Sequence, residues 1–320
     1  MGGGWLVTGG AGYIGGHVVR ALLASGREVV VVDDFSTGLP ARVPCGVPVL
    51  RGDVTDAGWL TQVVGETRPD GVVHVAGKKS PTESVLDPLL YARENVAGVT
   101  ALLTALRATG GTRIVFSSSC AVYGTPPGPT VGEDDPKRPE SPYGDSKWYG
   151  ERLLAAAARA YGLGVISLRY FNVVGAAEPA LADTGVHNLV PLVLRALRDG
   201  VPPRVFGTDY PTADGTCVRD YVDVEDLADA HVRAVEALED GAAPAAYNVG
   251  RGQGASVLAV LDLLRRTTGV DFDHQVCPRR PGDPASVVGR VDRIAAELGW
   301  TARRDLATTL EAAWRAERPR

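Results

Sequence analysis

The sequence predicts an α/β protein in which a doubly wound parallel sheet is followed by a smaller mixed α/β domain. Short runs rich in β-branched residues alternate with amphipathic helical patterns through the first half of the chain. The runs are apolar at nearly every position, as expected for strands that helices cover on both faces. After about residue 175 the pattern changes to segments rich in proline, glycine and aspartate.

The expected strands and helices alternate in the order that a parallel sheet requires. Strands are predicted at residues 5–8, 28–32, 48–50, 72–75, 113–117 and 165–168. Helices are predicted at residues 13–24, 59–66, 84–107 and 146–160. Because crossovers between parallel strands are right-handed, this order builds a doubly wound sheet.

The second half is expected to hold five further helices among longer loops. They are predicted at residues 189–198, 224–238, 256–268, 292–298 and 306–315. Asp223 precedes one of them and is expected to cap it, because its carboxylate can accept hydrogen bonds from the first turn. We therefore expect one domain over residues 1–175 and a second over 176–320, with part of residues 220–250 packing back on the first sheet.

Composition and charge exclude several classes of protein. The 320 residues are 45% hydrophobic and 22% charged, which permits a buried core and excludes a disordered or fibrous chain. A net charge of -5 gives no reason to expect binding to nucleic acid. The four cysteines form no Cys-x-x-Cys pair, so neither a metal site nor a disulfide framework is expected. Without a signal peptide or a run of 18 apolar residues, we expect a cytoplasmic protein that does not enter the membrane.

A glycine pattern follows the first predicted strand. Gly9 allows a tight turn, Gly12 lets the backbone approach a diphosphate, and Gly15 lets the helix pack closely on the strand. The N–H groups at the start of the helix would then face the phosphates. Asp33 ends the second strand, where a carboxylate accepts hydrogen bonds from ribose hydroxyls and repels a 2′-phosphate. This arrangement predicts a Rossmann domain that prefers NAD to NADP.

A second pattern indicates acid–base chemistry. Tyr143 and Lys147 lie four residues apart and therefore share one helical face. A nearby ammonium and a positive nicotinamide ring would lower the pKa of the tyrosine from about 10, so that it can act as a base. The fifth strand ends in serines, at the edge where such sheets bind ligands, and Ser119 is expected to pass a substrate proton to Tyr143. Cys120 has no histidine near it in sequence to activate it, so we expect a small buried residue there.

The glycine pattern, Asp33, the serine strand and the Tyr143–Lys147 pair, in this order, resemble the extended short-chain dehydrogenase/reductase family. Downstream segments narrow the resemblance, which runs from Trp5 to Trp300, to the UDP-glucose (UDP-galactose) 4-epimerase family. These segments are residues 169–172, 187–189, 206–212, 214–221 and 278–283.

The resemblance implies a role for each matching residue. Tyr143 would be the base, Ser119 its proton relay, and Lys147 its electrostatic partner. The implied NAD ligands are Gly9, Gly12, Tyr13, Ile14, Gly15, Asp33, Asp34, Phe35, Ser36, Thr37, Gly38, Asp53, Val54, Val75, Ala76, Gly77, Lys79, Asn95, Ser117, Tyr143, Lys147, Tyr170 and Phe171. The implied UDP-sugar ligands are Lys79, Ser119, Tyr143, Asn172, Asn188, Leu189, Arg204, Val205, Phe206, Arg219, Tyr221, Arg280, Asp283 and Val287. Arginines suit a diphosphate because their planar fork donates two hydrogen bonds at once.

The resemblance also implies the reaction and the assembly. The reaction would be the NAD-dependent, reversible inversion at the sugar 4-position of UDP-glucose or UDP-galactose, through a 4-keto sugar. The assembly would be a homodimer built from the helices at residues 84–107 and 146–160, with no metal ion. His74 and His187 match no catalytic position and are expected to be structural.

Some residues depart from the family pattern. Lys78 and residues 80–82, on either side of Lys79, differ from the usual residues after the Ala-Gly pair. Val173 stands where many relatives have proline. Val287 stands where some relatives have tyrosine, and its smaller volume predicts that UDP-N-acetylglucosamine and UDP-N-acetylgalactosamine are accepted too.

Two alternatives remain open at this point. One is a 4-epimerase of another NDP-sugar in secondary metabolism, and the other is a non-catalytic NAD-binding regulator. A sugar-nucleotide dehydratase is disfavoured, because it would carry Thr-Asp-Glu where this chain has Ser118, Ser119 and Cys120.

Overall fold

The computed structural model describes residues 3–185, 188–280 and 282–317, and a seven-stranded parallel sheet lies at its centre. The strand order is β10-β6-β5-β4-β1-β2-β3, and every pairing is parallel. The strands are β1 (Trp5–Thr8), β2 (Val29–Asp33), β3 (Val49–Arg51), β4 (Gly71–His74), β5 (Arg113–Ser119), β6 (Gly164–Tyr170) and β10 (Ala245–Val249). The predicted doubly wound parallel sheet is confirmed. The order reverses between β1 and β4, and such sheets bind ligands at this point.

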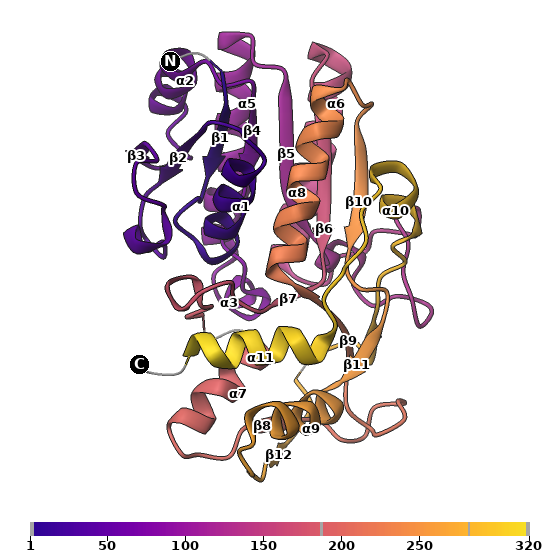
Figure 1. Cartoon of the computed structure of the whole chain (residues 1–320). Helices are drawn as coiled ribbons and strands as arrows, with labels where there is room; N and C mark the ends of the chain where they lie inside the picture. Colours follow the sequence, from indigo (N-terminus) through magenta and orange to yellow (C-terminus); the bar gives the residue numbers. More distant parts are fainter. Residues whose placement is uncertain (1–2, 186–187, 281, 318–320) are drawn as a thin grey trace.

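Helices cover both faces of the sheet (Figure 1). On one face lie α1 (Tyr13–Ala24) and α8 (Val224–Glu239), and on the other lie α2 (Ala57–Thr67), α5 (Gly98–Thr109) and α6 (Pro142–Tyr161). Successive side chains of a strand point to opposite faces, so Val7 belongs to the first hydrophobic core and Leu6 to the second. Both cores are fully buried, which fixes the strand ends that carry the site.

The single helix expected at residues 84–107 is divided in the structure. It consists of α3 (Pro81–Leu86), α4 (Pro88–Tyr91), a π-helical turn at Ala92–Ala97, and α5. Pro88 has no N–H to continue a helix, and the Asp87 side chain instead accepts a hydrogen bond from Leu90 N and starts α4. The prediction of one continuous helix was therefore wrong.

A second group of elements lies beyond the strand ends, in the lower part of Figure 1. A four-stranded sheet there contains β7 (Asn172–Val174), β9 (Val218–Asp223), β11 (Gly254–Ser256) and β13 (Ser286–Val287), while β8 (Arg204–Phe206) pairs with β12 (Gln275–Cys277). The helices α7 (Leu189–Arg198), α9 (Val257–Thr268) and α11 (Leu306–Glu317) pack with these strands around a third core. The remaining helix, α10 (Asp292–Leu298), contacts β10 of the large sheet.

Two elements from the second half of the chain return to the large sheet. The strand β10 pairs with β6, and α8 packs beside α1. Asp223 caps α8 as expected, since its carboxylate accepts a hydrogen bond from Glu225 N. The chain therefore crosses the boundary between the two layers several times, and ligand-facing loops from both halves meet there.

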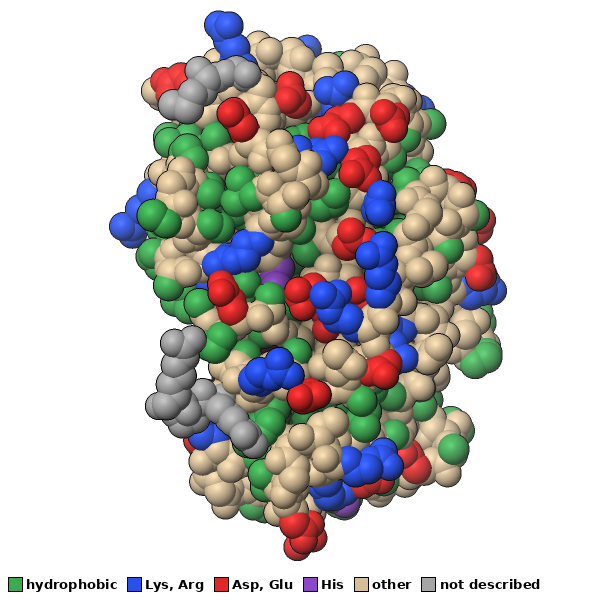
Figure 2. All heavy atoms as spheres, in the orientation of Figure 1, with side chains coloured by type: hydrophobic (Ala, Val, Ile, Leu, Met, Phe, Trp, Pro, Cys, Tyr) green, Lys and Arg blue, Asp and Glu red, His purple; other side chains and the backbone are tan. Residues whose placement is uncertain are grey.

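Acidic and basic side chains are intermixed on the face of the molecule shown in Figure 2. Among the residues that the structure describes, no helix is both long and apolar enough to cross a membrane.

Candidate active site

A cleft at the C-terminal ends of β1, β2, β4, β5 and β6, which we call the glycine-loop cleft, has a volume of about 330 Å³. All of the residues expected to bind NAD line it except Phe35, Asn95 and Phe171. Its walls include the glycine turn after β1, the acidic end of β2 and the start of α6. The structure therefore gathers nearly all of these predicted residues at one edge of the sheet.

The glycine turn leaves no room for side chains. Gly9 has a φ of +71°, and a Cβ on it would lie 2.7 Å from Ala76 N. A Cβ on Gly15 would lie 2.0 Å from Gly9 O. No side chain caps the N-terminus of α1, so the N–H groups of its first turn are left for another partner. A diphosphate fits such a turn, because both the N–H groups and the helix dipole favour an anion there.

Asp33 is held firmly at the end of β2. Its Oδ2 accepts a hydrogen bond from Ala11 N and its Oδ1 accepts one from Phe35 N, each at 2.9 Å. Burial raises the pKa of this carboxyl, while the two backbone N–H groups act in the opposite direction. The carboxylate is thus fixed where a ribose would approach the sheet edge.

Sequence reasoning missed Arg42, which also lines the glycine-loop cleft. Its Nη2 donates to Ala182 O at 2.7 Å and to Thr184 Oγ1 at 3.2 Å. Arg42 follows no motif, and only folding brings it to the loop at residues 182–185, so no local signal could have found it. The sequence shows no arginine beside Asp33, but the structure places one in the same cleft.

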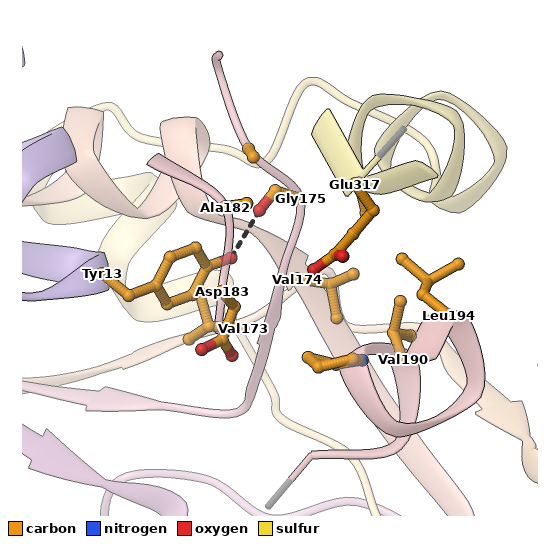
Figure 3. Close-up of a pocket in the computed structure, with 12 residues that line it drawn as sticks. Tyr13, Val173, Val174, Gly175, Ala182, Asp183, Val190, Leu194 and Glu317 are labelled. Carbon is orange, nitrogen blue, oxygen red and sulfur yellow. Dashed lines mark hydrogen bonds between the residues drawn. The ribbon is translucent and has the colours of Figure 1, made fainter. Parts of the chain in front are cut away.

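Two cleft residues help to tie the cleft to the second half of the chain. Tyr13 projects from the start of α1, and its hydroxyl donates to Gly175 O at 2.7 Å, beside a small cavity (Figure 3). Lys79 Nζ lies 3.6 Å from Asp183 Oδ1 and 5.7 Å from the centre of the Tyr13 ring. Lys79 thus lines the cleft despite the unusual residues around it.

The three predicted NAD residues outside the cleft have other contacts. Asn95 accepts a hydrogen bond from Lys78 N at 2.8 Å and donates to Ser146 Oγ at 2.9 Å, so it fixes the loop after β4. Phe35 has a φ of +61°, and the Arg51 guanidinium lies over its ring. Phe171 is buried in a separate hydrophobic cluster.

Tyr143 and Lys147 lie in the first turns of α6 and both line the glycine-loop cleft. Ser141 caps this helix, and its Oγ accepts a hydrogen bond from Gly144 N at 3.2 Å. Burial raises the pKa of Tyr143 to about 12, although the hydrogen bond with Ser119 acts to lower it. Lys147 Nζ donates to Ser117 O at 2.9 Å, and burial lowers its pKa to about 8. The lowering of the tyrosine pKa was expected from Lys147 and a nicotinamide ring together; among the groups of the protein itself, desolvation outweighs the groups that lower it.

Behind the cleft, Tyr170 joins β6 to α8. His231 Nδ1 lies 2.9 Å from Leu227 O, a carbonyl that can only accept, so the proton is on Nδ1 and Nε2 is the acceptor. The Tyr170 hydroxyl then donates to His231 Nε2 at 2.6 Å and accepts from Ser117 Oγ at 2.5 Å. The hydroxyl that faces the cleft is thus held from two sides.

The remaining candidates are structural in this geometry. Desolvation raises the pKa of the Cys120 thiol to about 12, so it stays protonated at neutral pH. His74 is buried, hydrogen-bonded to Thr8 Oγ1 and stacked on Phe116, while His187 lies outside the described residues. In the described part of the chain, no three His, Cys, Asp or Glu side chains are grouped to hold a metal ion.

A second cleft of about 560 Å³, which we call the arginine cleft, lies among β7, β8, β9 and α7. The residues expected to bind the UDP-sugar that line this cleft are Asn172, Asn188, Leu189, Arg204, Phe206, Arg219, Tyr221, Arg280 and Asp283. Val205, Val287 and Ser119 are buried and line neither cleft, although Ser119 is hydrogen-bonded to Tyr143. Sequence reasoning missed the apolar wall, which comprises Leu192, Val193, Ala196, Val201, Pro202, Pro203, Cys217 and Val257.

The arginine cleft combines cationic and apolar surfaces. The Arg280 guanidinium carbon lies 3.9 Å from the centre of the Phe206 ring, and Arg219 is paired with Asp283. Guanidinium groups bind phosphate oxygens, while aromatic and aliphatic side chains favour a flat base. The cleft thus has the chemistry that a nucleoside diphosphate requires. It begins at Asn172, two residues after Tyr170 of the glycine-loop cleft, so the two clefts are neighbours.

Comparisons with known proteins agree with this geometry. Residues 5–250 match the family described as the NAD dependent epimerase/dehydratase family. The chain is 44% identical over 305 residues to UDP-glucose 4-epimerase of Azospirillum brasilense, covering 94% of this chain and 87% of that protein.

Solved structures are similar over nearly the whole chain. UDP-glucose-4-epimerase from Stenotrophomonas maltophila, solved with bound NAD and formylated UDP-arabinopyranose, has a TM-score of 0.93 and 38% identity, covering 98% of this chain and 97% of that one. The UDP-Glc/GlcNAc 4-epimerase from Campylobacter jejuni has a TM-score of 0.87 and 32% identity, covering 99% of each chain. The chain therefore belongs to the NAD-dependent epimerase/dehydratase family, and the resemblance to UDP-glucose 4-epimerases that its motifs indicated is confirmed.

Proposed function

We propose that the protein catalyses the NAD-dependent, reversible epimerisation of a UDP-hexose at its 4-position, interconverting UDP-glucose and UDP-galactose. The observation that carries this proposal is the meeting of two clefts of different chemistry. One offers a dinucleotide-binding turn and the Tyr143–Lys147 pair, and the other offers arginines for a nucleoside diphosphate. A sugar attached to that diphosphate would reach from the second cleft toward the first.

The residues have distinct tasks in this reaction. Bound NAD would supply the hydride acceptor and donor for carbon 4 of the sugar. Tyr143 takes the 4-hydroxyl proton through Ser119. It returns the proton after the 4-keto sugar has rotated and presents its opposite face to the glycine-loop cleft. Lys147 offers a cation near the phenol, and its pKa of about 8 keeps it largely protonated at neutral pH. Arg219 and Arg280 hold the diphosphate, which leaves the sugar free to rotate.

The alternatives have less support. Water elimination would need an acid–base pair beside Ser119, and the neighbouring Cys120 thiol has a pKa of about 12. The curated relatives are UDP-glucose 4-epimerases at about 40% identity, and nothing in the clefts favours another NDP-sugar or a non-catalytic regulator. The Campylobacter jejuni relative is a UDP-Glc/GlcNAc enzyme, and we extend the proposal to N-acetylated UDP-sugars for this chain as well.

We further infer a cytoplasmic homodimer. Val85, Leu86 and Leu89 are 63%, 83% and 80% exposed on α3 and α4, and these helices pack beside α6, where Tyr149 is 49% exposed. A second copy would cover this apolar surface. Leu89→Glu should convert a dimer into monomers in sedimentation experiments, and a wild-type chain that sediments as a monomer would reject the inference.

Product analysis after incubation with UDP-galactose tests the activity. UDP-glucose should appear without net consumption of NAD. A dehydrated 4-keto-6-deoxy sugar would instead indicate a dehydratase, and an unchanged substrate would favour a regulator.

A further inference from the structure

A buried carboxylate lies on the same face of α6 as the two residues proposed for catalysis. Tyr143, Lys147 and Glu151 follow one another at intervals of four residues, so their side chains share one helical face. Glu151 Oε1 accepts hydrogen bonds from Ser118 Oγ and from Arg169 Nε, the latter at 2.9 Å. Arg169 Nη2 donates to Glu151 Oε2 at 2.6 Å. The carboxylate therefore links α6 to both β5 and β6.

The strand register places this link directly next to the site. Ser118 of β5 is paired with Arg169 of β6, and the next pair along the two strands is Ser119 with Tyr170. Glu151 thus joins α6 to β5 at the residue before Ser119, the proposed proton relay. It joins α6 to β6 at the residue before Tyr170, which lines the glycine-loop cleft.

The guanidinium extends the network beyond α6. Arg169 Nη1 donates to Tyr123 Oη at 2.9 Å and to Glu133 O at 3.1 Å. The Tyr123 hydroxyl in turn donates to Asn248 Oδ1 at 2.7 Å. The ion pair is thus bonded to residues of β5, of the turn that holds Tyr123 and of the segment that holds Glu133, in addition to α6 and β6 themselves.

Neither Glu151 nor Arg169 lines the glycine-loop cleft or the arginine cleft, whereas their partner Ser118 does line the glycine-loop cleft. Ser118, Glu151 and Arg169 are only 2%, 6% and 3% exposed. Removing two charges from water is costly, and apolar residues of similar volume often serve stability equally well. A role in stability alone is thus a weak explanation for this pair.

We propose that Glu151 and Arg169 are positioning residues that set the placement of Tyr143 against Ser119. The proposal rests on the epimerase function proposed above. Proton transfer needs the two oxygens within about 2.6–3.2 Å. A displacement of α6 by about 1 Å can therefore lower turnover about 10²-fold while the clefts still bind their ligands.

The test compares two variants of the network with a matched control. Glu151→Gln removes the charge, and Ser118→Ala removes only the neutral hydroxyl that joins the carboxylate to β5. The control is Asp226→Asn, because Asp226 is 2% exposed and accepts 2.9 Å hydrogen bonds from Arg303 N and Arg304 N, yet it lines neither cleft. For each protein, kcat and KM for UDP-galactose, the NAD content and the Tm are measured.

Glu151→Gln should lower kcat about 10- to 100-fold and Ser118→Ala about fivefold, with KM and NAD content unchanged. Asp226→Asn should lower Tm at least as much and keep its kcat. The proposal is overturned if kcat falls only with the folded fraction, if KM rises instead, or if the control loses the same turnover. Should Glu151→Gln fail to fold, Arg169→Lys decides the question, because it keeps the charge, loses the paired hydrogen bonds to Glu151 and lines neither cleft.

A readout without turnover separates this proposal from the proposed function. The phenol of Tyr143, which interacts with Ser119, Cys120, Tyr91 and Tyr170, is titrated by ultraviolet difference spectra against Tyr143→Phe. Ser118→Ala should move its midpoint to higher pH than in the wild type, because a displaced Ser119 no longer stabilises the phenolate. An unmoved midpoint overturns the positioning role, whereas a wild-type enzyme that leaves UDP-galactose unchanged rejects the epimerase function.

Discussion

Arg219 donates a hydrogen bond from Nη2 to Oδ1 of Asp283 over 2.9 Å, and both side chains line the arginine cleft. The pair joins β9 to the segment that follows β12. A carboxylate in this position orients the guanidinium before a ligand arrives, which reduces the entropy lost on binding.

Arg219→Ala should therefore weaken the binding of UDP. A hydrogen bond to a charged group contributes about 1.5–3 kcal/mol, which corresponds to roughly 10- to 150-fold in Kd. Asp283→Asn should have a smaller effect, since it removes only the orienting charge. Calorimetric titration with UDP measures both, with Arg266→Ala on the exposed face of α9 as the control. Equal affinity in wild type and Arg219→Ala would remove Arg219 from the site.

Tyr143→Phe should abolish most turnover while NAD and UDP still bind. The ring keeps its contact with Tyr91, whose ring centre lies 6.1 Å away, and only the hydroxyl is lost. Loss of a general base typically costs about 10²–10⁴-fold in rate. Steady-state kinetics with UDP-galactose measure the effect, and Tyr149→Phe, an exposed position on the same helix, is the control. Turnover near that of wild type in Tyr143→Phe would contradict the assignment.

The cofactor preference depends on Asp33 and Arg42 together. The Asp33 carboxylate should repel a 2′-phosphate, so NADP should restore far less activity to apo-protein than NAD does. Arg42 lies in the same cleft but is already bonded to Ala182 O and Thr184 Oγ1. We therefore expect Asp33→Gly to improve NADP binding, and Asp33→Gly combined with Arg42→Ala to lose that gain. Equal reconstitution of the wild type by both cofactors would refute the preference.

Buried histidines should make the protein less stable in mild acid. Desolvation lowers the pKa of His74 to about 3 and that of His231 to about 4, from a usual value of 6.5. The unfolded chain therefore takes up protons near pH 6.5 while the folded chain does not, and the free energy of unfolding falls as the pH drops from about 6.5 toward 4. Above about pH 7 these two residues should contribute no pH dependence.

Urea unfolding at pH 7.5, 6 and 5 measures this effect. One unit of pKa shift corresponds to about 1.4 kcal/mol, so the two residues together should cost a few kcal/mol by pH 5. His74→Gln should flatten the dependence without abolishing it, because His231 and His17, whose pKa burial also lowers to about 4, still titrate. A free energy of unfolding that stays constant from pH 7.5 to 5 would contradict the prediction.

Sequence reasoning located the parts of the fold that have a strong local signal. The amphipathic patterns gave α1, α7 and α10 their observed bounds. It predicted none of the strands after β6. Of these, β7, β8, β11, β12 and β13 have only two or three residues each, which is too little pattern, and they depend on distant partners.

The same distinction applies to the site. The glycine turn and the downstream motifs placed most cleft residues, since each motif is continuous in sequence. Arg42 and Asp183 were missed, because each reaches the glycine-loop cleft only through tertiary packing. The raised pKa of Tyr143 was missed for a related reason, as desolvation depends on what surrounds the phenol in space.

The last prediction concerns Val287, whose size should decide whether N-acetylated UDP-sugars are accepted as well as UDP-galactose. It lies in β13 beside Arg219 of β9, and its side chain packs in a cluster with Val122, Tyr123, Val131 and Phe171. In relatives that carry tyrosine at this position, the tyrosine ring is expected to crowd the 2-substituent of the sugar. A tyrosine would not fit this close-packed cluster, so its ring would have to turn out toward the sugar.

Wild type should therefore epimerise UDP-N-acetylgalactosamine as well as UDP-galactose, because valine stays within the cluster and leaves that space open. Val287→Tyr should lower kcat/KM for the acetylated sugar about tenfold or more and change that for UDP-galactose little. Val287→Ile, which adds one methylene and no ring, should keep both activities. Assays of each protein with both substrates test this prediction. It fails if the wild type already rejects the acetylated sugar, or if Val287→Tyr accepts that sugar unchanged. In either case another side chain sets the substrate range.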